Sequence, residues 1–180
     1  KLVKRLRRKT QMPLCAMTYY NLIFRFGEEK FLREAREAGL DGLIIPDLPV
    51  EEAGPLISLS HSYGIDVILF LAPTTSKNRA RQIVKKARGF IYYVSLTGVT
   101  GQRTSLPADL AANLKEIKKL TGIPVCVGFG VSRPEHVRLV YKVADGAIVG
   151  SAIIGQIKKN IGKTGPAGKV GRFVKGLANV

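Results

Sequence analysis

Three glycine-bearing segments of the chain could bind an oxyanion through their backbone. Each follows a short apolar run, and they are SLTGVTG (95–101), GFGVS (128–132) and GSAI (150–153). Glycine lets a ligand approach the main chain closely, and the start of a helix adds N–H donors with a partial positive charge. Tight turns would explain any one of these glycines, but three consecutive strand ends favour a phosphate site. We expect Gly130, Gly150 and Ser151 to hold that phosphate, with the Ser151 N–H and hydroxyl as donors.

Side chains suited to acid–base chemistry are scarce near these segments. Asp47 ends the apolar run GLIIP (42–46) and is the best-placed carboxylate, either in a pocket or as a turn cap. His61 and His136 fall on helical patterns and are expected at the surface. Arg103 could reach a phosphate, although a solvated loop charge is the simpler interpretation. No GxGxxG is present, so the dinucleotide fingerprint is excluded.

Composition limits the classes of function. The chain has 29 Lys and Arg against 13 Asp and Glu, a net charge of +16. Such a charge suits nucleic acid or an anionic surface, but no helix-turn-helix or zinc spacing accompanies it. No apolar run reaches the roughly 18 residues of a membrane span, and the basic first residues are not expected to form a signal peptide. The simpler interpretation of the charge is a basic cytoplasmic enzyme, or a fragment whose acidic part is missing. We expect no nucleic-acid or membrane partner, and we expect Cys15 and Cys126 to be buried free thiols.

Alternating elements must position these residues. Six apolar runs predict strands, at 12–18, 42–46, 66–72, 90–95, 124–128 and 146–150. Amphipathic patterns between and after them predict helices at 28–39, 51–63, 76–89, 106–122, 132–144, from 151 onward and at about 168–178. Continuous apolar strands spaced by one helix indicate a parallel sheet of βα units, whose carboxyl-terminal strand ends carry function. The fold class is therefore α/β, as a barrel or as a doubly wound sheet.

Six longer motifs resemble the tryptophan synthase alpha chain family, in order and in spacing. They are MTYYNLIFRFG (17–27), DGLIIPDLPVEEA (41–53), APTT (72–75), YYVSLTGVTG (92–101), PVCVGFGVSRPEHV (124–137) and ADGAIVGSAII (144–154). The resemblance implies a (β/α)₈ TIM barrel, represented here by about six βα units, strands three to eight. It also implies one barrel domain over 1–180 that is incomplete at its N-terminus.

The resemblance further implies a lyase of tryptophan biosynthesis. That family cleaves indole-3-glycerol phosphate to indole and glyceraldehyde 3-phosphate by a retro-aldol reaction. The residues implied for substrate binding are Tyr19, Asp47, Tyr92, Thr100, Gly101, Phe129, Gly130, Gly150 and Ser151. Asn21 would face a beta chain that carries pyridoxal phosphate, whereas this chain itself would need no cofactor and no metal.

The chain departs from the family at the reaction chemistry. The family uses a Glu at the end of strand two and an Asp on the following loop. Both are expected upstream of Lys1, so no catalytic residue is assigned within this sequence. A six-unit barrel would also leave exposed strand edges. We therefore expect the natural protein to be longer by about two βα units.

Other functions remain open at this point. They are a non-catalytic phosphate-binding barrel, another phosphate-binding isomerase or synthase of amino-acid biosynthesis and, remotely, a nucleic-acid binder. Indole release would distinguish the lyase from the non-catalytic barrel, and salt-sensitive binding of mixed-sequence DNA would favour the nucleic-acid binder.

Overall fold

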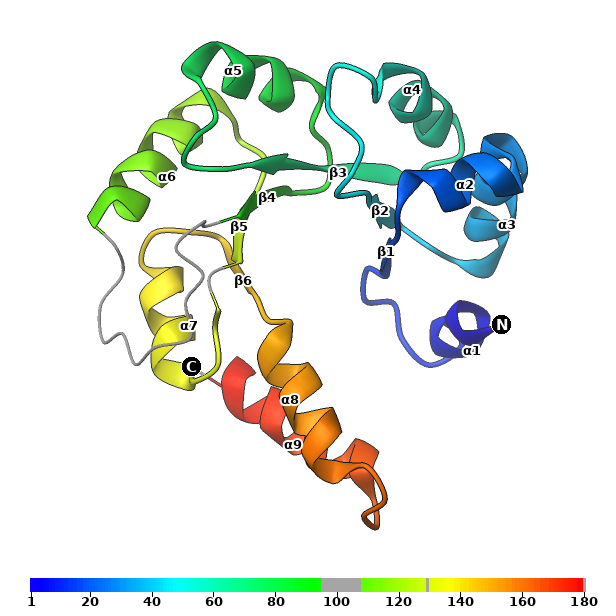
Figure 1. Cartoon of the computed structure of the whole chain (residues 1–180), viewed down its shortest axis with the longest axis vertical. Coiled ribbons are helices and arrows are strands. Elements are labelled where there is room, and N and C mark those ends of the chain that lie inside the picture. Colours follow the sequence, from blue (N-terminus) through cyan, green and yellow to red (C-terminus); the bar gives the residue numbers. More distant parts are fainter. Residues whose placement is uncertain (95–107, 129, 180) are drawn as a thin grey trace. The chain divides into compact units, whose positions relative to one another are not determined.

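Helices and strands alternate along the chain, as Figure 1 shows for the computed structural model, which describes residues 1–94, 108–128 and 130–179. The strands are β1 (Cys15–Met17), β2 (Gly42–Ile44), β3 (Asp66–Leu71), β4 (Ile91–Val94), β5 (Val125–Gly128) and β6 (Gly146–Ile148). The helices are α1 (Leu2–Arg7), α2 (Tyr20–Phe26), α3 (Glu28–Ala38), α4 (Gly54–Ser62), α5 (Lys77–Lys86), α6 (Ala108–Leu120), α7 (Pro134–Tyr141), α8 (Ser151–Asn160) and α9 (Pro166–Ala178). Every strand predicted from an apolar run is confirmed.

The order of the strands distinguishes the two α/β architectures. Neighbouring strands follow the order β1-β2-β3-β4-β5-β6, which is also their order in the chain. The register is parallel for β1 with β2, for β2 with β3 and for β5 with β6. A doubly wound sheet reverses its strand order at a switch point, whereas a (β/α)₈ barrel adds strands in sequence. The fold is therefore of the TIM-barrel class, and the doubly wound alternative is wrong.

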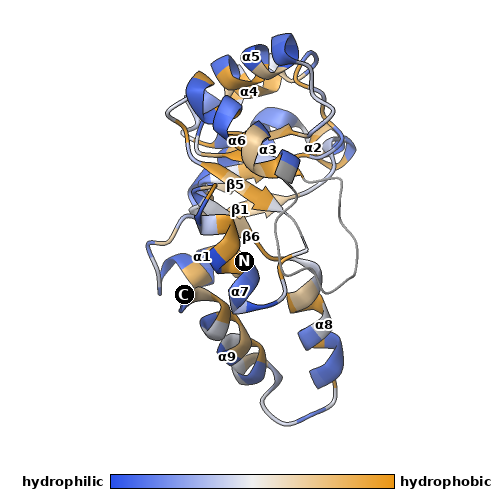
Figure 2. Ribbon diagram, turned by 90° about the vertical axis from the view of Figure 1, so that its left-hand side faces the viewer, coloured by the Kyte–Doolittle hydropathy of each residue, from blue (hydrophilic) through white to orange (hydrophobic). Residues whose placement is uncertain are grey.

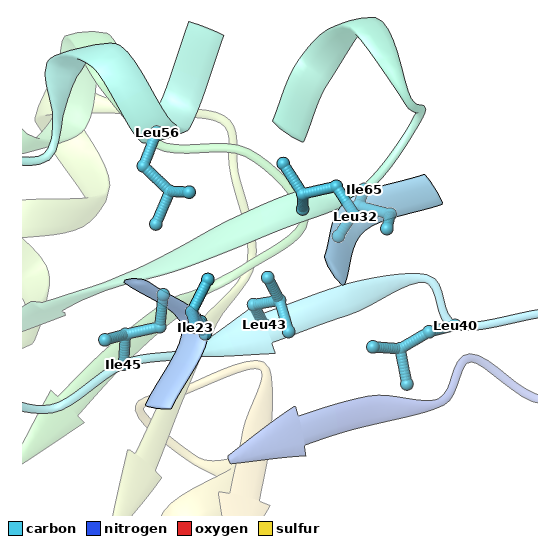
Figure 3. Close-up of a cluster of buried hydrophobic side chains, with 7 residues drawn as sticks. All are labelled: Ile23, Leu32, Leu40, Leu43, Ile45, Leu56 and Ile65. Atoms are coloured by element: carbon cyan, nitrogen blue, oxygen red, sulfur yellow. The ribbon is translucent and has the colours of Figure 1, made fainter. Parts of the chain in front are cut away.

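The chain divides into two compact units. Unit 1 comprises residues 1–70 and 78–91, and unit 2 comprises residues 71–77 and 92–180. In unit 1, apolar side chains of α2, α3, β2 and α4 form a buried cluster with those that flank β2 and precede β3 (Figure 3). Its members are Ile23, Leu32, Leu40, Leu43, Ile45, Leu56 and Ile65, none more than 4% exposed. Their burial holds α2, α3 and α4 against the strands, at about 1.5–3 kcal/mol for each large side chain.

Unit 2 has a core of its own. The predicted apolar face of α6 buries Leu110, Leu114 and Ile117, while Leu120 at the end of that helix remains 40% exposed. Strand β5 buries Val125 and Val127. Helix α9 packs against both α7 and α8. Helix α7 in turn contacts β6, the strand that ends shortly before Gly150.

The amino-terminal end of β2 is tied to β1 through one carboxylate. Asp41, the residue before β2, accepts a hydrogen bond from the Leu14 N–H at 2.7 Å and is ion-paired with Arg7. Arg7 also donates to the carbonyl oxygen of Gly39, at 2.6 Å from Nη2. Within the strands, Cys15 is the register partner of Gly42, where a Cβ atom would lie 2.8 Å from the cysteine Sγ.

The same arrangement recurs at β5 and β6. Asp145, the residue before β6, accepts a hydrogen bond from the Val125 N–H at 2.9 Å and pairs with Lys118 of α6 at 2.7 Å. Cys126 is the register partner of Gly146, where a Cβ would lie 2.7 Å from Sγ. The strand pairs β1–β2 and β5–β6 are thus each held at the amino end by an Asp, a cation and a Cys–Gly contact.

Four expectations about individual segments are wrong. No helix was predicted between 18 and 28, yet Tyr20–Phe26 form helix α2, in which Ile23 is fully buried. His136 is 9% exposed instead of lying on the surface, and its Nδ1 lies 3.4 Å from the Ser132 nitrogen. Helix α7, predicted over 132–144, begins only at Pro134, with Arg133 as an N-cap that has extended backbone angles. Both cysteines are free as expected, but Cys15 is exposed and Cys126 half-buried.

Candidate functional site

The carboxyl ends of β5 and β6 bring two of the predicted phosphate-binding glycines to one edge of unit 2. Gly128, the last residue of β5, is the register partner of Ile148, the last residue of β6. Gly130 and Gly150 each follow two residues after that pair. Because the two strands are parallel, both glycines leave the sheet at the same edge.

The backbone at these glycines leaves room for a ligand. Gly130 has φ of 69°, in the left-handed region that side chains other than glycine rarely adopt. A Cβ atom built at Gly130 or at Gly150 would meet no described heavy atom within 4 Å. The space beside both glycines is therefore open among the described residues.

Helix α8 presents backbone donors to this edge. It begins at Ser151, with Gly150 as N-cap, and no side chain caps its first turn. The N–H groups of Ile153 and Ile154 already donate to the Gly150 carbonyl, at 2.9 and 3.1 Å. The N–H groups at the very start of a helix have no acceptor within it, so those of Ser151 and Ala152 point outward. We call Gly130, Gly150 and Ser151 the phosphate corner.

Electrostatics at the phosphate corner favour an anion. A ten-residue helix places its positive dipole end at Ser151. The sequence from Gly146 to Val180 contains no Asp or Glu. A phosphate at this corner would therefore meet N–H donors and a positive helix end, with no Asp or Glu from the same stretch of chain beside it.

Tyr92 lies close to the same strand end. It is half-buried in β4, and a Cβ atom at Gly128 would lie 2.7 Å from its Cε2 and 2.8 Å from its hydroxyl oxygen. Because Gly128 has no side chain, the Tyr92 ring can occupy the space beside it. Burial raises the pKa of the Tyr92 hydroxyl above its usual value, so the group stays protonated at neutral pH. Gly128 was not singled out for this role by sequence, since its contact partner lies 36 residues earlier in the chain.

The predicted site residues of unit 1 gather at the carboxyl ends of β1 and β2. Asp47 accepts two hydrogen bonds from the Tyr20 N–H, at 2.9 Å from Oδ1 and 3.1 Å from Oδ2. Tyr20 also donates its hydroxyl to Glu28 at 2.8 Å. Tyr19 is 62% exposed and Asn21 is exposed, so both are accessible. The Asp47 carboxylate thus binds the backbone at the start of α2, which joins the segment after β2 to the segment after β1.

Some sequence predictions lie outside the described residues. Thr100, Gly101, Arg103 and Phe129 are among them. The Glu and Asp expected upstream of Lys1 are not residues of this chain, whose first described element is the N-cap Lys1 with helix α1. The candidate site therefore contains no assigned acid or base.

The part of the chain that the structure describes contains no group of three His, Cys, Asp or Glu side chains that could hold a metal ion. Likewise, none of the helices found in the described ranges combines the length and apolarity that crossing a bilayer requires.

Comparison with known proteins gives one consistent relationship. Residues 1–174 match the family model described as the tryptophan synthase alpha chain. The tryptophan synthase alpha chain of Methanocaldococcus jannaschii is 46% identical over 165 residues, which are 91% of this chain and 59% of that protein. That of Carboxydothermus hydrogenoformans is 49% identical over 153 residues, 85% of this chain and 57% of that protein. The chain thus spans less than two thirds of the length of these relatives.

Solved structures agree with these sequence relatives. A tryptophan synthase α2β2 complex from Pyrococcus furiosus contains a chain that superimposes with a TM-score of 0.89 at 37% identity, covering 99% of this chain and 72% of that one. The alpha chain from Legionella pneumophila superimposes with a TM-score of 0.86 at 34% identity, covering 98% of this chain and 65% of that one. On the evidence of its sequence motifs, its strand order and these matches, the chain belongs to the tryptophan synthase alpha chain family.

Proposed function

We propose that the protein is a carbon–carbon lyase that cleaves indole-3-glycerol phosphate to indole and glyceraldehyde 3-phosphate. Membership of the alpha chain family supports the reaction class. The alternative of a different phosphate-binding isomerase or synthase is set aside, because that membership covers nearly the whole chain.

In this proposal the phosphate corner anchors the substrate. The Ser151 N–H and hydroxyl, together with the backbone at Gly130 and Gly150, would hold the phosphate oxygens, and Gly101 would add to them. Anchoring one end of a substrate fixes the reacting end relative to the catalytic groups, which lowers the entropic part of the barrier. Tyr92 and Phe129 would line the glycerol and indole part, with Tyr19 and Asp47, and Thr100 would close over it.

The acid–base chemistry is not assigned to any residue of this chain. It would belong to the Glu and Asp expected upstream of Lys1. Asp47 binds the Tyr20 N–H through both carboxylate oxygens, which supports a positioning role rather than proton transfer. Cleavage by these 180 residues alone is therefore expected to be weak or absent, while phosphate binding is expected to persist.

The partner in this proposal is a tryptophan synthase beta chain. The alpha chain itself would need no cofactor and would act in the cytoplasm. Indole would pass to a beta chain carrying pyridoxal phosphate, with Asn21 on α2 facing that partner. The α2β2 assembly of the Pyrococcus furiosus neighbour supports such a pairing.

The open backbone at Gly150 is the observation that carries the proposal, and a substitution there tests it. Gly150→Asp would put a carboxylate where the phosphate is expected, without meeting a described neighbour. Gly155→Asp is the matched control, since it adds the same charge to the same helix and also meets nothing within 4 Å. We expect Gly150→Asp to weaken binding of glycerol 3-phosphate, measured by calorimetry, at least tenfold, and Gly155→Asp to change it less than threefold.

Activity is a separate readout. Indole release from indole-3-glycerol phosphate would be followed with and without a tryptophan synthase beta chain, in a protein that includes the segment before Lys1. Release that Gly150→Asp lowers and Gly155→Asp spares supports the lyase. Phosphate binding at Gly150 without any indole release favours the non-catalytic binding barrel, and equal binding by the two variants contradicts the phosphate corner.

A further inference from the structure

A cavity of about 520 Å³ lies between α6 and the segment that follows α7, and the proposed function does not use it. We call it the lysine pocket. Four lysines and two small apolar residues line it: Ala111, Lys115, Lys118, Lys119, Lys142 and Val143. Sites for small molecules commonly have volumes of about 300–1,000 Å³, so the lysine pocket is large enough for a small organic ligand.

The lysine pocket belongs to the middle of the sheet and not to one of its open edges. Helix α6 precedes β5 and helix α7 follows it, and β5 has β4 on one side and β6 on the other. Further βα units would join the sheet beyond β1 and β6, whereas both helices of this pocket flank β5. The pocket also lies apart from the phosphate corner, because Val143 comes before β6 while Gly150 comes after it.

The side chains of the lysine pocket offer hydrogen-bond donors and apolar surface, but no acceptor. A lysine ammonium group has three donors and no acceptor, while the half-buried Ala111 and Val143 have only hydrocarbon side chains. Figure 2 shows hydrophilic and hydrophobic residues together on α6 and α7. A sugar or an amide would leave its own O–H or N–H donors without side-chain acceptors here. A carboxylate only accepts, so the lining favours an acid with an apolar body.

Two of the four lysines are neutralised within the protein. Lys118 pairs with Asp145 at 2.7 Å, and Lys119 pairs with Glu116 at 2.6 Å. Both lysines also lie in the last turn of α6, where a cation offsets the negative end of the helix dipole. The folded chain itself therefore accounts for these two charges.

The other two lysines, Lys115 and Lys142, are left for a ligand. Both are exposed, and neither forms an ion pair with a carboxylate of the described residues. Lys115 lies on α6, and Lys142 is the C-cap residue of α7, so each helix contributes one charge. A ligand with two separated negative groups would match them. A nucleic acid would pair its phosphates with exposed lysines anywhere on the surface and would make no use of an apolar cavity.

We propose that the lysine pocket binds a small dicarboxylate whose two carboxylates are separated by an apolar body. The carboxylates would pair with Lys115 and Lys142, and the body would cover Ala111 and Val143. The site is independent of the phosphate corner, so either proposal stands if the other fails.

The experiment uses the full chain and three small acids. Terephthalate is the probe, since it holds two carboxylates on opposite ends of a rigid ring. Benzoate has the ring with one carboxylate, and malonate has two carboxylates without a ring. Binding is measured by calorimetry with glycerol 3-phosphate in excess, so that the phosphate corner is occupied. We expect terephthalate to bind at least tenfold more tightly than benzoate or malonate, with an affinity that falls as salt rises.

A carboxylate built into the pocket should take the place of the ligand. Ala111→Glu puts a glutamate among the lining residues, four residues before Lys115, which is the favourable order for an ion pair on a helix. We expect it to weaken terephthalate binding at least tenfold. Ala112→Glu is the matched control, because it adds the same charge to the next residue of α6, which is exposed and does not line the pocket. It should change the affinity less than threefold.

Lysine variants give a second, independent readout. Lys115→Gln and Lys142→Gln should each weaken terephthalate at least fivefold, whereas Lys158→Gln, at an exposed position on α8, should leave it within twofold. Neither pocket variant should lower the thermal melting point, since each removes a charge that repels the other lysines of the pocket. If Ala111→Glu destabilises the fold, these lysine variants decide the question instead.

Three results would overturn the proposal. Equal binding of terephthalate, benzoate and malonate, or no binding of any of them, removes the dicarboxylate as the ligand. Terephthalate binding that survives Lys115→Gln and Lys142→Gln places the probe elsewhere on the protein. Binding of mixed-sequence DNA that both lysine variants abolish, without any binding of terephthalate, assigns these lysines to a nucleic acid instead.

Discussion

The strand pair β1–β2 in unit 1 and the strand pair β5–β6 in unit 2 are alike at one end and different at the other. At the amino end of each, an Asp before the second strand accepts an N–H from the start of the first strand and pairs with a cation from a helix. Each also places a cysteine against a glycine that is its register partner. The repeated element joins two neighbouring strands through contacts between protein groups.

At the carboxyl end the two pairs diverge. After β2, the exposed carboxylate of Asp47 accepts the Tyr20 N–H at the start of helix α2. After β6, a glycine and an uncapped helix start leave the backbone open. In barrels of parallel strands, the amino-terminal face carries stability and the carboxyl-terminal face carries chemistry. If the proposed function holds, the strand pair β5–β6 follows that division.

The largest predicted effect comes from the cysteine–glycine contacts. A Cβ at Gly42 would lie 2.8 Å from the Cys15 Sγ and 3.2 Å from the carbonyl oxygen of Asp66, whereas at Gly146 it would meet only Cys126 at under 3.4 Å. A sulfur can rotate away, but a sheet carbonyl cannot. We expect Gly42→Ala to lower the free energy of unfolding by about 2 kcal/mol and Gly146→Ala by about 1 kcal/mol, as overpacking does. Urea denaturation measures both.

Rescue variants separate the two causes. Adding Cys126→Ala should restore most of the stability of Gly146→Ala, while adding Cys15→Ala should restore only part of that of Gly42→Ala, since the Asp66 carbonyl remains. Gly122→Ala is the control, because its Cβ meets nothing within 4 Å. If Gly42→Ala and Gly146→Ala lose equal stability, and if removing the cysteine sulfur restores neither, the cysteine–glycine contacts do not explain the effect. The two strand pairs would then not be alike at their amino ends.

A smaller effect is expected at the carboxyl ends, where the first turn of α2 is capped and that of α8 is not. Asp47→Ala removes both acceptors of the Tyr20 N–H, and loss of a helix cap costs about 1 kcal/mol. Hydrogen exchange of the α2 amides should therefore quicken about fivefold. Ser151→Ala should change the exchange of α8 less than twofold, because no side chain caps that helix.

The result that would contradict this contrast is simple to recognise. In that result, Ser151→Ala speeds amide exchange in α8 as much as Asp47→Ala speeds it in α2. The Ser151 hydroxyl then stabilises its own helix, which contradicts its assignment to a bound phosphate. Amides of α3, which follows α2 directly, serve as the internal reference in both variants.

Much of this fold was predictable from the sequence, because apolar runs separated by amphipathic helices determine parallel βα units. What escaped prediction depends on contacts between distant residues. Helix α2 has its cap in Asp47, 27 residues away, so residues 19–27 show no local start signal. Cys15 is exposed because β1 is the first strand in the sheet order, a feature that the apolar run around it does not reveal.

The candidate site was predictable to a similar extent. The positions of Gly130, Gly150 and Ser151 after their strands follow from the sequence, and the register of Gly128 with Ile148 supports their grouping. The position of the Tyr92 ring could not be predicted from the sequence. It depends on the contact with Gly128 of β5, which has no side chain beside the ring. Similarly, the position of His136 early in a helix gives no sign that its ring is buried.

The smallest predicted effect concerns the ion pair that fastens β6. Burial raises the pKa of Asp145, but the hydrogen bonds from Lys118 and from the Val125 N–H outweigh it, so the pKa lies below its ordinary value of 3.8. A carboxyl whose pKa is lowered by folding stabilises the protein above its unfolded pKa and loses that contribution as pH falls through the folded pKa. Asp145→Asn should therefore destabilise the protein at pH 7 by less than about 1 kcal/mol, since the pair is partly exposed. The difference from the parent protein, measured by urea denaturation, should shrink as pH falls below about 4.

A second variant divides this effect between its two sources. Lys118→Met should reduce the same pH dependence, and in its presence Asp145→Asn should retain only the part that comes from the Val125 N–H. The difference in free energy of unfolding between Asp145→Asn and the parent protein could instead stay constant from about pH 7 to about pH 3, on both sides of the ordinary carboxyl pKa. The Asp145 side chain would then stabilise the strand pair by packing and not by its charge. The repeated Asp–cation pairs would then not be electrostatic anchors, and the likeness between the amino ends of β1–β2 and β5–β6 would be one of packing.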